Sequence, residues 1–286
     1  MSGIELTSTK SARVIAARRL AKRAARTQQR LFLAEGPQAV REAAARPGVV
    51  KELFMTADAA RRHPELTALA GVPTHQVSGQ VMDSLAQTVT PQGVVAVCGY
   101  LDRPLATVIA GRPRLVAVLA AVRDPGNAGT VIRVADAAGA DAVVLTDSSV
   151  DVYNGKCVRA TAGSLFHLPV VTGVAAEPAL AQLRDAGLRV LAADGRAPRD
   201  LDDALDRDEL VGPTAWLFGN EAWGLPADLT ALCDLAIRVP IHGQAESLNL
   251  ATAAAVCLYA SARAHRTIDP AAEGSYRSRL GKYVGS

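Results

Sequence analysis

The run LVAVLAAV at residues 115–122 contains no polar side chain. A strand that faces water on one side alternates apolar and polar residues, so an unbroken apolar run predicts a strand that is buried on both faces. Such strands belong to parallel sheets, which are covered by helices on both sides. The run therefore predicts an α/β fold with a parallel sheet for the part of the chain around it.

Strand-length apolar stretches and helix-length segments continue to alternate after this run. Strands that are joined through helices pair in parallel, so the alternation predicts a doubly wound parallel sheet. The expected helices cover residues 126–139, 156–166, 178–187, 226–233 and 247–266, and the expected strands cover residues 142–145, 168–171, 188–193, 214–218 and 235–240.

A second set of shorter elements precedes residue 100. A strand and a helix are separated by a Gly-Pro break within residues 31–44, and Ser78 stands where it can cap a helix. These elements predict a compact α/β unit. Its other expected strands cover residues 49–55, 74–77 and 93–100, and its other expected helices cover residues 57–71 and 78–87.

Together these patterns predict a layout of five parts. They are a basic N-terminal helix or extension (1–30), a small α/β domain (31–100), a linker with one short helix (101–113), the parallel-sheet domain (114–265) and a flexible tail that is rich in Gly, Ser and charged residues (266–286).

The charge of the chain is unevenly distributed. The net charge is +3, but the first 100 residues hold 13 Lys and Arg against 7 Asp and Glu. This asymmetry indicates that the N-terminal part faces a polyanion such as RNA, and a solvated basic helix is the alternative. Arg18, Arg19 and Arg23 are the candidate RNA contacts in the basic segment.

Composition excludes several classes of protein. The chain has no apolar run of about 18 residues, so no membrane span is expected, and its N-terminus lacks the apolar core of a signal peptide. The four cysteines are far apart and form no CxxC pair. This usage fits the reducing cytoplasm and predicts no structural zinc site.

Polar residues gather where three of the predicted strands end, and such positions carry the chemistry of α/β proteins. Asn127 follows the Asp-Pro-Gly turn after residues 115–122, and Arg133 lies six residues further on. Arg133 could reach a phosphate, while a helix-capping asparagine and a surface arginine are the simpler interpretation. The segment has no GxGxxG pattern, which disfavours a dinucleotide-dependent oxidoreductase.

The second and third clusters also combine glycines or polar residues at the end of a predicted strand. Glu221 lies between Gly219 and Gly224, which permit close backbone approach or a positive φ. Ser247 and Asn249 fall in the predicted first turn of the closing helix, where free N–H groups collect. A plain turn and simple capping remain the alternatives for these two clusters.

In order and spacing, the three clusters resemble the motifs of the SpoU (TrmH-like) branch of the SPOUT RNA 2′-O-ribose methyltransferases. The matching stretches are NAGTVIRVADAAGA, FGNEAWGL and VPIHGQAESLNLATAAAVCLY, and the resemblance covers roughly residues 114–262. The phrases LAEGPQAVREA and TVTPQGVVAV are similar to the small, ribosomal-protein-like RNA-binding domain that precedes the catalytic domain in many members.

This resemblance implies a deep trefoil knot near the C-terminus, S-adenosylmethionine as the methyl donor, and a homodimer. It implies no metal and no membrane partner. It places Asn127, Arg133, Glu221, Ser247 and Asn249 at the catalytic rim, with Arg159 as a phosphate contact at its edge. The implied cofactor-binding residues are Ala193, Gly219, Val239, Ile241 and Leu248.

The implied reaction is methyl transfer to a ribose 2′-OH of RNA. An arginine is a poor base, so the expected role of Arg133 is to hold the phosphate beside the target ribose. The extra N-terminal domain favours 23S rRNA as the substrate. A tRNA ribose methyltransferase and a non-catalytic RNA-binding or ribosome-assembly factor on the same fold are the alternatives, and the sequence names neither the target nucleotide nor the proton acceptor.

Overall fold

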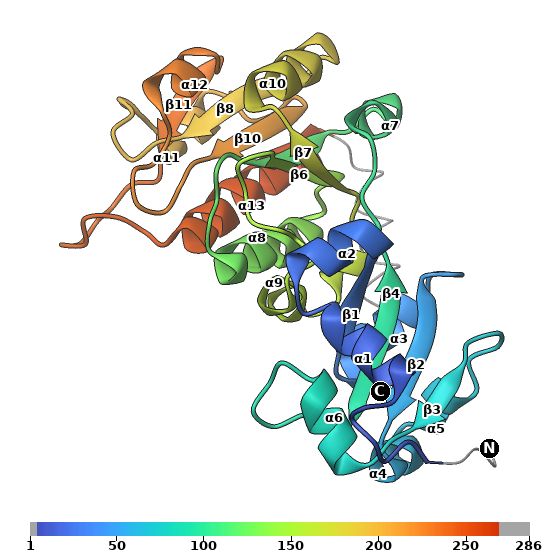
Figure 1. Ribbon diagram of the computed structural model, residues 1–286. Coiled ribbons are helices and arrows are strands. Elements are labelled where there is room, and N and C mark those ends of the chain that lie inside the picture. Colours follow the sequence, from blue (N-terminus) through green and yellow to red (C-terminus); the bar gives the residue numbers. More distant parts are fainter. Residues whose placement is uncertain (1–4, 269–286) are drawn as a thin grey trace. The chain divides into compact units, whose positions relative to one another are not determined.

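The computed structural model describes residues 5–268, and most of the predicted tail at 266–286 therefore lies outside the described residues. Contacts divide the chain into two units. The first takes in the residues up to Asp102 together with Asp124–Arg133 and Val150–Pro169, and the second takes in Arg103–Arg123, Val134–Ser149 and the residues from Val170 on. Figure 1 shows the chain coloured along the sequence.

The first unit is built on a mixed four-stranded sheet of order β1-β4-β2-β3. β4 pairs antiparallel with β1 and β2, and β2 pairs parallel with β3. The strands are β1 (Leu31–Glu35), β2 (Val50–Met55), β3 (Thr74–Gln76) and β4 (Val94–Gly99), and the helices between them are α3 (Pro37–Ala44), α4 (Ala57–Arg62), α5 (Pro64–Thr67) and α6 (Gly79–Leu85).

Two short helices occupy the basic segment for which the sequence predicted one. They are α1 (Ala12–Arg19) and α2 (Arg23–Gln29). The chain turns at Leu20, which is buried in the core of this unit. The Arg26 side chain is also buried, and its Nη1 donates to the carbonyl oxygens of Leu20 and Ala21 at 2.9 and 2.8 Å. Arg26 therefore fixes the turn and does not face solvent.

The predicted helix at residues 57–71 is likewise divided. Pro64 begins α5, and His63 before it has a non-helical backbone with φ −131° and ψ 62°. Proline lacks an N–H group and disfavours helical geometry in the residue before it, so α4 ends at Arg62.

Residues 150–169 contribute aromatic side chains to the core of the first unit. The rings of Tyr153 and Phe166 lie 4.8 and 6.1 Å from the ring of Phe32 on β1. The Tyr153 hydroxyl accepts hydrogen bonds from the backbone of Leu101 and Asp102, both at 2.7 Å. This segment carries α9 (Gly155–Ala160) and a 3-10 turn, η1 (Ser164–Phe166).

The second unit contains a seven-stranded parallel sheet, which confirms the predicted fold class. The strand order is β7-β6-β5-β10-β8-β11-β9. Every strand pair is parallel. The strands are β5 (Leu115–Leu119), β6 (Ala142–Thr146), β7 (Val170–Val174), β8 (Arg189–Ala193), β9 (Arg199–Asp200), β10 (Thr214–Phe218) and β11 (Leu235–Arg238).

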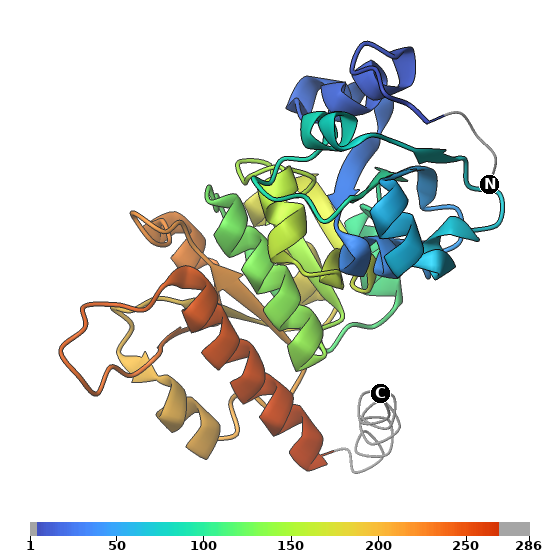
Figure 2. The ribbon, with the colours of Figure 1, turned by 90° about the horizontal axis from the view of Figure 1, so that it is seen from below.

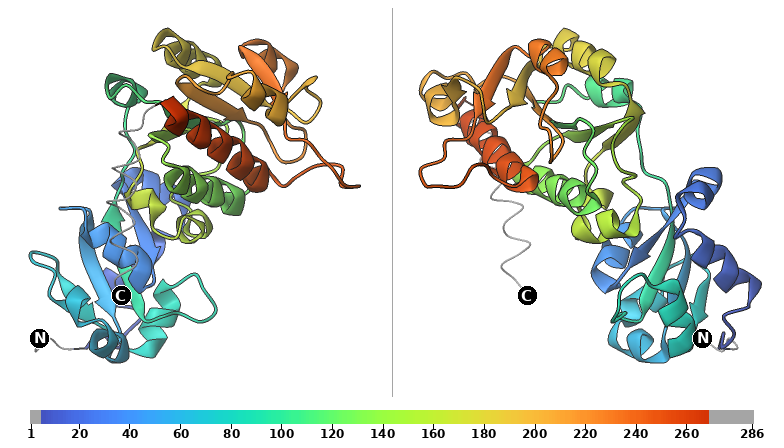
Figure 3. Two further views of the ribbon diagram at one scale, coloured as in Figure 1. Left: turned by 180° about the vertical axis from the view of Figure 1, so that it is seen from behind. Right: turned by 60° about the vertical axis from the view of Figure 1, so that its left-hand side comes forward.

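Helices cover both faces of this sheet (Figures 2 and 3). Ala215 and Leu217 of β10 belong to the apolar core that includes Leu180 and Leu183 of α10. Trp216 points to the opposite face and donates its Nε1–H to Ser261 of α13 at 2.8 Å. The helices beyond β4 are α7 (Leu105–Ala110), α8 (Pro125–Ala138), α10 (Ala176–Asp185), α11 (Leu201–Asp206), α12 (Ala227–Ala231) and α13 (Leu250–Ile268).

The sequence analysis missed β9 and α11. β9 is only two residues long, too short for any alternation of apolar residues to appear. Asp200 ends this strand and caps α11, because its side chain accepts from the Asp203 N–H at 2.9 Å. None of the described helices is long and apolar enough to cross a membrane.

His265 near the end of α13 makes the second unit sensitive to acid. Its Nε2–H donates to the Gly212 carbonyl at 2.8 Å, and burial lowers its pKa. A lowered pKa means that the unfolded chain binds the proton more readily, so stability is complete above about pH 6.5 and falls as the pH drops below it. We expect the melting temperature to fall between pH 7.5 and 5.5.

The matched variant His265→Gln keeps a donor but removes the titration. Its melting temperature should decline less over this interval, by about 2–4 °C, the change that roughly 1 kcal/mol produces in a chain of this size. The control His242→Gln alters an exposed loop residue and should behave like the parent protein. Scanning calorimetry checks this, and parallel declines in all three proteins would contradict it.

Candidate cofactor and catalytic site

A cavity of about 430 Å³ opens at the carboxyl ends of β8, β10 and β11. In open parallel sheets, ligands bind at this edge. All five residues predicted to contact a cofactor line the cavity, together with two of the predicted catalytic residues. These are Ala193, Gly219, Val239, Ile241 and Leu248, with Glu221 and Ser247.

Asn220 holds the loop that forms one wall of this cavity. The residue is 6% exposed. Its Nδ2 donates to the Ala121 carbonyl after β5 at 2.7 Å, and its Oδ1 accepts from the Ala222 N–H at 2.8 Å. Its backbone exchanges two hydrogen bonds with Gly224. No role was predicted for Asn220, although asparagine side chains often bond the backbone two residues further on and so mark turns.

The packing of its own loop requires a glycine at position 219, where the backbone approaches closely as expected. A Cβ atom at this position would lie 2.5 Å from the Gly224 oxygen and 2.6 Å from the Leu225 nitrogen, both in its own loop. Real Cβ atoms do not come this close to backbone. Gly224 has a φ of +72°, the left-handed geometry that glycine favours. Both glycines therefore fold the loop tightly.

Glu221 lies at the mouth of the cavity and is exposed. Its Oε2 accepts a hydrogen bond from the backbone N–H of Arg123 at 3.3 Å. Glu221 and Asn220 thus both link the loop after β10 to the chain that leaves β5. Trp223 in the same loop is 57% exposed.

The third cluster differs from the sequence prediction. The closing helix begins at Leu250, and Asn249 caps it by accepting from the backbone of Ala251 and Thr252 at 2.8 and 3.4 Å. Ser247 consequently lies in the loop before the helix and not in its first turn. Ser247 still reaches the cavity, whereas Asn249 is absent from its lining.

The loop from residue 239 to residue 248 supplies five of the residues that line the cavity. Across the described part of the chain, no backbone-to-backbone hydrogen bond involves these residues. Ile241 is 38% exposed although its side chain is large and apolar. A planar heterocyclic ligand needs apolar side chains against its faces and hydrogen-bonding groups at its edge, and this loop has both kinds of group.

Asn127 and Arg133 both lie on α8, in the part assigned to the first unit. Asp124 caps this helix, because its Oδ1 accepts from the Asn127 N–H at 2.8 Å. The ammonium of Lys156, hydrogen-bonded to Asp124, lowers the pKa of that carboxyl. Asp124, and not Asn127 as in the simpler interpretation, is therefore the residue that caps α8.

Arg133 is exposed, and within the range 5–268 its guanidinium makes no hydrogen bond or ion pair. A guanidinium that no other described residue engages is available to bind a ligand. Arg18, Arg19 and Arg23 are also exposed, on α1 and α2. Arg159 on α9 is only half-exposed and pairs with Glu35 at 3.4 Å.

His, Cys, Asp and Glu side chains do not gather in groups of three or more that could hold a metal ion, within the part of the chain that the structure describes. Three carboxylates line the cavity without forming such a group, and they are Asp194, Glu221 and Glu246. Burial alone would raise the pKa of Asp194, but hydrogen bonds from Arg196 outweigh it and lower that pKa.

A loop-lined cavity at the carboxyl edge of a parallel sheet is the ligand site of an α/β enzyme. Residues 114–259 match the model of the SpoU rRNA Methylase family, and residues 11–96 match the MRM3-like substrate binding domain. The chain therefore belongs to the SpoU rRNA methylase family, and the resemblance inferred from its three motifs is confirmed.

Named relatives of similar length include the 23S rRNA (guanosine(2553)-2′-O)-methyltransferase RlmP of Bacillus subtilis. It is 38% identical over 257 residues, which are 89% of this chain and 98% of the relative. The 23S rRNA (guanosine-2′-O-)-methyltransferase RlmB of Bordetella pertussis is 31% identical over 76% of this chain and 90% of its own.

Solved structures agree with the fold. The AdoMet-bound rRNA methyltransferase from Sinorhizobium meliloti superimposes with a TM-score of 0.80 at 32% identity, covering 91% of this chain and 97% of its own. The SpoU methyltransferase AviRb from Streptomyces viridochromogenes in complex with AdoMet gives a TM-score of 0.79 at 29% identity, over 89% and 98% of the two chains.

The packing around Gly219 predicts a contrast between two glycines of this site. Gly219→Ala should destabilise the protein by about 1–3 kcal/mol, because the new methyl group overlaps the backbone of the loop. Gly243→Ala, where a Cβ meets nothing within 4 Å, should change the stability by less than about 0.5 kcal/mol. Urea unfolding of both variants measures the difference, and equal stabilities would show that the loop does not close against Gly219.

Proposed function

We propose that this protein methylates a ribose 2′-OH in 23S rRNA with S-adenosylmethionine as the methyl donor. The observation that carries the proposal is the cavity in which all five predicted cofactor residues meet. The names of the relatives support rRNA as the substrate, and the match to a substrate-binding domain supports a large RNA. Mapping 2′-O-methyl groups in rRNA and tRNA with and without the gene tests it directly.

The cavity fits the cofactor in size, polarity and charge. Its volume of about 430 Å³ lies within the roughly 300–1,000 Å³ of small-molecule sites. Ile241 and Leu248 offer apolar surface to an adenine ring, while the free backbone of the loop offers donors and acceptors to its edge. The carboxylates of Asp194 and Glu246 suit a ligand that carries a sulfonium and an ammonium charge.

The cofactor supplies an electrophilic methyl group whose leaving group is a neutral thioether. The chain must therefore align the ribose oxygen and assist the loss of its proton. In the proposed mechanism Arg133 binds the phosphate next to the target ribose. Its planar guanidinium can donate two parallel hydrogen bonds to one phosphate, which fixes the position of the adjoining sugar.

The other predicted catalytic residues orient the nucleotide. Glu221 stands at the mouth of the cavity, where its carboxylate can hold an arginine or a ribose hydroxyl. Ser247 lines the cavity and presents a hydroxyl to the nucleotide. Asn249 fixes the start of α13, and Asn127 is proposed to orient Arg133 or the ribose. The phosphate or a neighbouring group takes the proton.

Further features belong to the same proposal. The chain leaving β11 is proposed to pass through a deep trefoil knot, and the protein is proposed to act as a cytoplasmic homodimer that needs no metal. Light scattering tests the dimer.

The proposed domains are residues 31–100 for RNA binding and 114–265 for catalysis, with 1–30 as a basic extension, 101–113 as a linker and 266–286 as a flexible tail.

The role of Arg133 predicts a loss of turnover without a loss of cofactor binding. Arg133→Ala should reduce methyl transfer about a hundredfold or more, because it removes charge stabilisation at the reacting nucleotide. Arg133→Lys should restore little, since a point charge does not replace the planar donor. The assay is tritium transfer from labelled cofactor to transcribed 23S rRNA, beside calorimetry with S-adenosylhomocysteine.

Two variants complete that experiment. Ile241→Asp places a charge on the apolar wall of the cavity and should abolish binding of S-adenosylhomocysteine, the reverse of the Arg133 result. Arg207→Ala removes another exposed arginine and should leave both readouts unchanged. Near-normal turnover in Arg133→Ala would remove this residue from the mechanism.

The exposed arginines of α1 and α2 predict a salt-dependent share of RNA affinity. Replacing Arg18, Arg19 and Arg23 by glutamine should weaken rRNA binding and reduce the slope of log affinity against log salt by about 2, if each contacts one phosphate. Substitution of these charges is a better test than removal of the N-terminal domain. Residues 150–169 belong to the core of the first unit, so truncation would expose that core.

A matched control neutralises three other exposed arginines, Arg61, Arg62 and Arg207. The control should leave the slope nearly unchanged when transcribed 23S rRNA is titrated at several salt concentrations. An equal loss in both triple variants would show a general charge effect in place of a contact surface on α1 and α2.

A further inference from the structure

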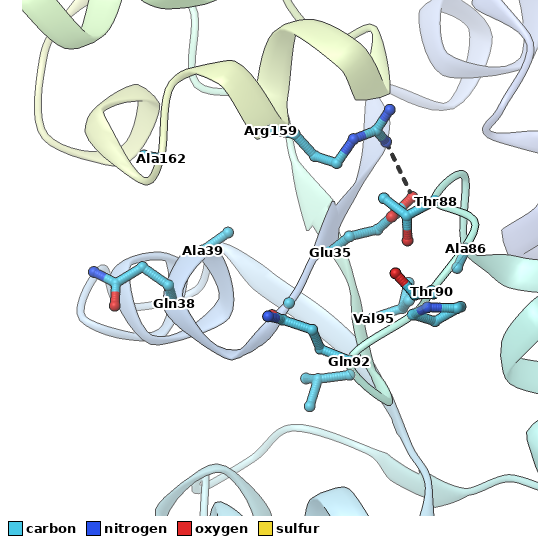
Figure 4. Close-up of a pocket in the computed structure, with 13 residues that line it drawn as sticks. Glu35, Gln38, Ala39, Ala86, Thr88, Thr90, Gln92, Val95, Arg159 and Ala162 are labelled. Atoms are coloured by element: carbon cyan, nitrogen blue, oxygen red, sulfur yellow. Dashed lines mark hydrogen bonds and ion pairs between the residues drawn. The ribbon is translucent and has the colours of Figure 1, made fainter.

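The first unit contains a second cavity, of about 380 Å³. Its wall is formed by the end of β1, the start of α3, the loop at residues 86–93 and α9 (Figure 4). No step of the proposed methyl transfer uses it. The polar residues that line it are Glu35, Gln38, Thr88, Thr90, Gln92 and Arg159.

Glu35 is the unusual member of this cavity. Its side chain is 8% exposed. One oxygen, Oε1, accepts from the Gln87 N–H at 2.6 Å and lies 3.4 Å from Nη1 of Arg159. The other oxygen, Oε2, is buried and has no hydrogen-bond partner among the described residues. Leaving a buried acceptor without a donor costs free energy, so a ligand that brings a donor to this oxygen would be stabilised here.

The surroundings of Glu35 define the shape of that donor. Apolar walls come from Ala39, Pro91, Val94 and Val95. Hydroxyl and amide groups come from the loop at 86–93, and Figure 4 shows Thr88 and Thr90 beside the Glu35 side chain, Gln92 below it and Arg159 above it. Gln38 instead donates to Glu42. Apolar walls with a polar end suit a flat heterocycle that has donors on one edge.

We propose that this cavity binds an unpaired guanine base of the RNA substrate. Glu35 accepts from the guanine N1–H and N2–H groups, and Arg159 donates to O6. This inference rests on the proposed function, since that function supplies the RNA. It makes the first unit a reader of one nucleotide as well as a cationic surface.

Guanine fits better than the other three bases because of its donor pattern. It alone presents two adjacent N–H donors and a carbonyl acceptor on one edge. On the same edge, adenine, cytosine and uracil each place a donor next to an acceptor. A carboxylate that accepts from that donor would be repelled by the lone pair of the neighbouring acceptor. Single-stranded RNA is the usual source of such an accessible base edge.

The test compares short single-stranded RNAs on the full-length protein. The probes are UUUGUUU, UUUAUUU and UUUIUUU, where I is inosine, which lacks the N2 amine. Fluorescence anisotropy at constant salt should show about tenfold tighter binding of the guanine probe than of the adenine probe. The inosine probe should fall between them.

Glu35→Gln is the matched variant, because it keeps the size and the acceptor for Gln87 but replaces one acceptor by a donor. It should reduce the preference for guanine to less than about twofold. Glu65→Gln removes the same charge from an exposed carboxylate on α5 and should keep the full preference. Thermal melting shows whether Glu35→Gln is folded.

Three outcomes would overturn the proposal. They are equal binding of all three probes by the parent protein, an unchanged preference in folded Glu35→Gln, and binding of free guanosine monophosphate as tight as that of UUUGUUU, which would assign the cavity to a nucleotide ligand. Methyl transfer and S-adenosylhomocysteine binding are measured in the same variants. If the parent protein showed no methyl transfer and no binding of S-adenosylhomocysteine but kept the preference for guanine, the methyltransferase proposal would be wrong and the assignment of this cavity would remain.

Discussion

The hydrogen bonds of Asn220 hold the candidate cofactor cavity in shape. The side chain joins the loop after β10 to the Ala121 carbonyl after β5, and these two strands are neighbours at the centre of the parallel sheet. Because the sheet fixes both strand ends, the loop between Gly219 and Gly224 has little freedom. The position of Glu221 at the mouth of the cavity follows from that closure, as does the need for a glycine at position 219.

Charged residues that look alike in the sequence have different roles in the first unit. Arg23 is exposed, whereas Arg26, three residues later, is buried and pairs with Asp151 at 2.6 Å. Glu35 is buried and one of its oxygens has no hydrogen-bond partner among the described residues, whereas Glu65 is an exposed surface carboxylate. In the proposed function, the net charge accounts for long-range attraction of this unit to RNA, and the buried carboxylate contacts one base.

Much of the fold could be predicted because its signals are local. Apolar runs located most strands of the parallel sheet, including β5 and β10, but not the two-residue strand β9. The predicted start of α13 was wrong because the cap is Asn249, and Ser247, an equally good capping residue, stands two positions earlier. The prediction of one helix in place of α1 and α2 was also wrong, since the break depends on the burial of Leu20 and on the hydrogen bonds of Arg26 to this turn.

The sequence by itself determined the fold class and the family, and it named seven of the residues that line the candidate cavity, because each depends on the order and spacing of residues along the chain. Only the tertiary structure decided what those residues touch. It showed that a side chain at position 219 would overlap the backbone of its own loop, and that Asn220 holds that loop in place. It also showed that one oxygen of Glu35 has no donor among the described residues, in a cavity formed with Arg159, which is more than 120 positions away. Such contacts join segments that the fold alone brings together, and no local pattern encodes them.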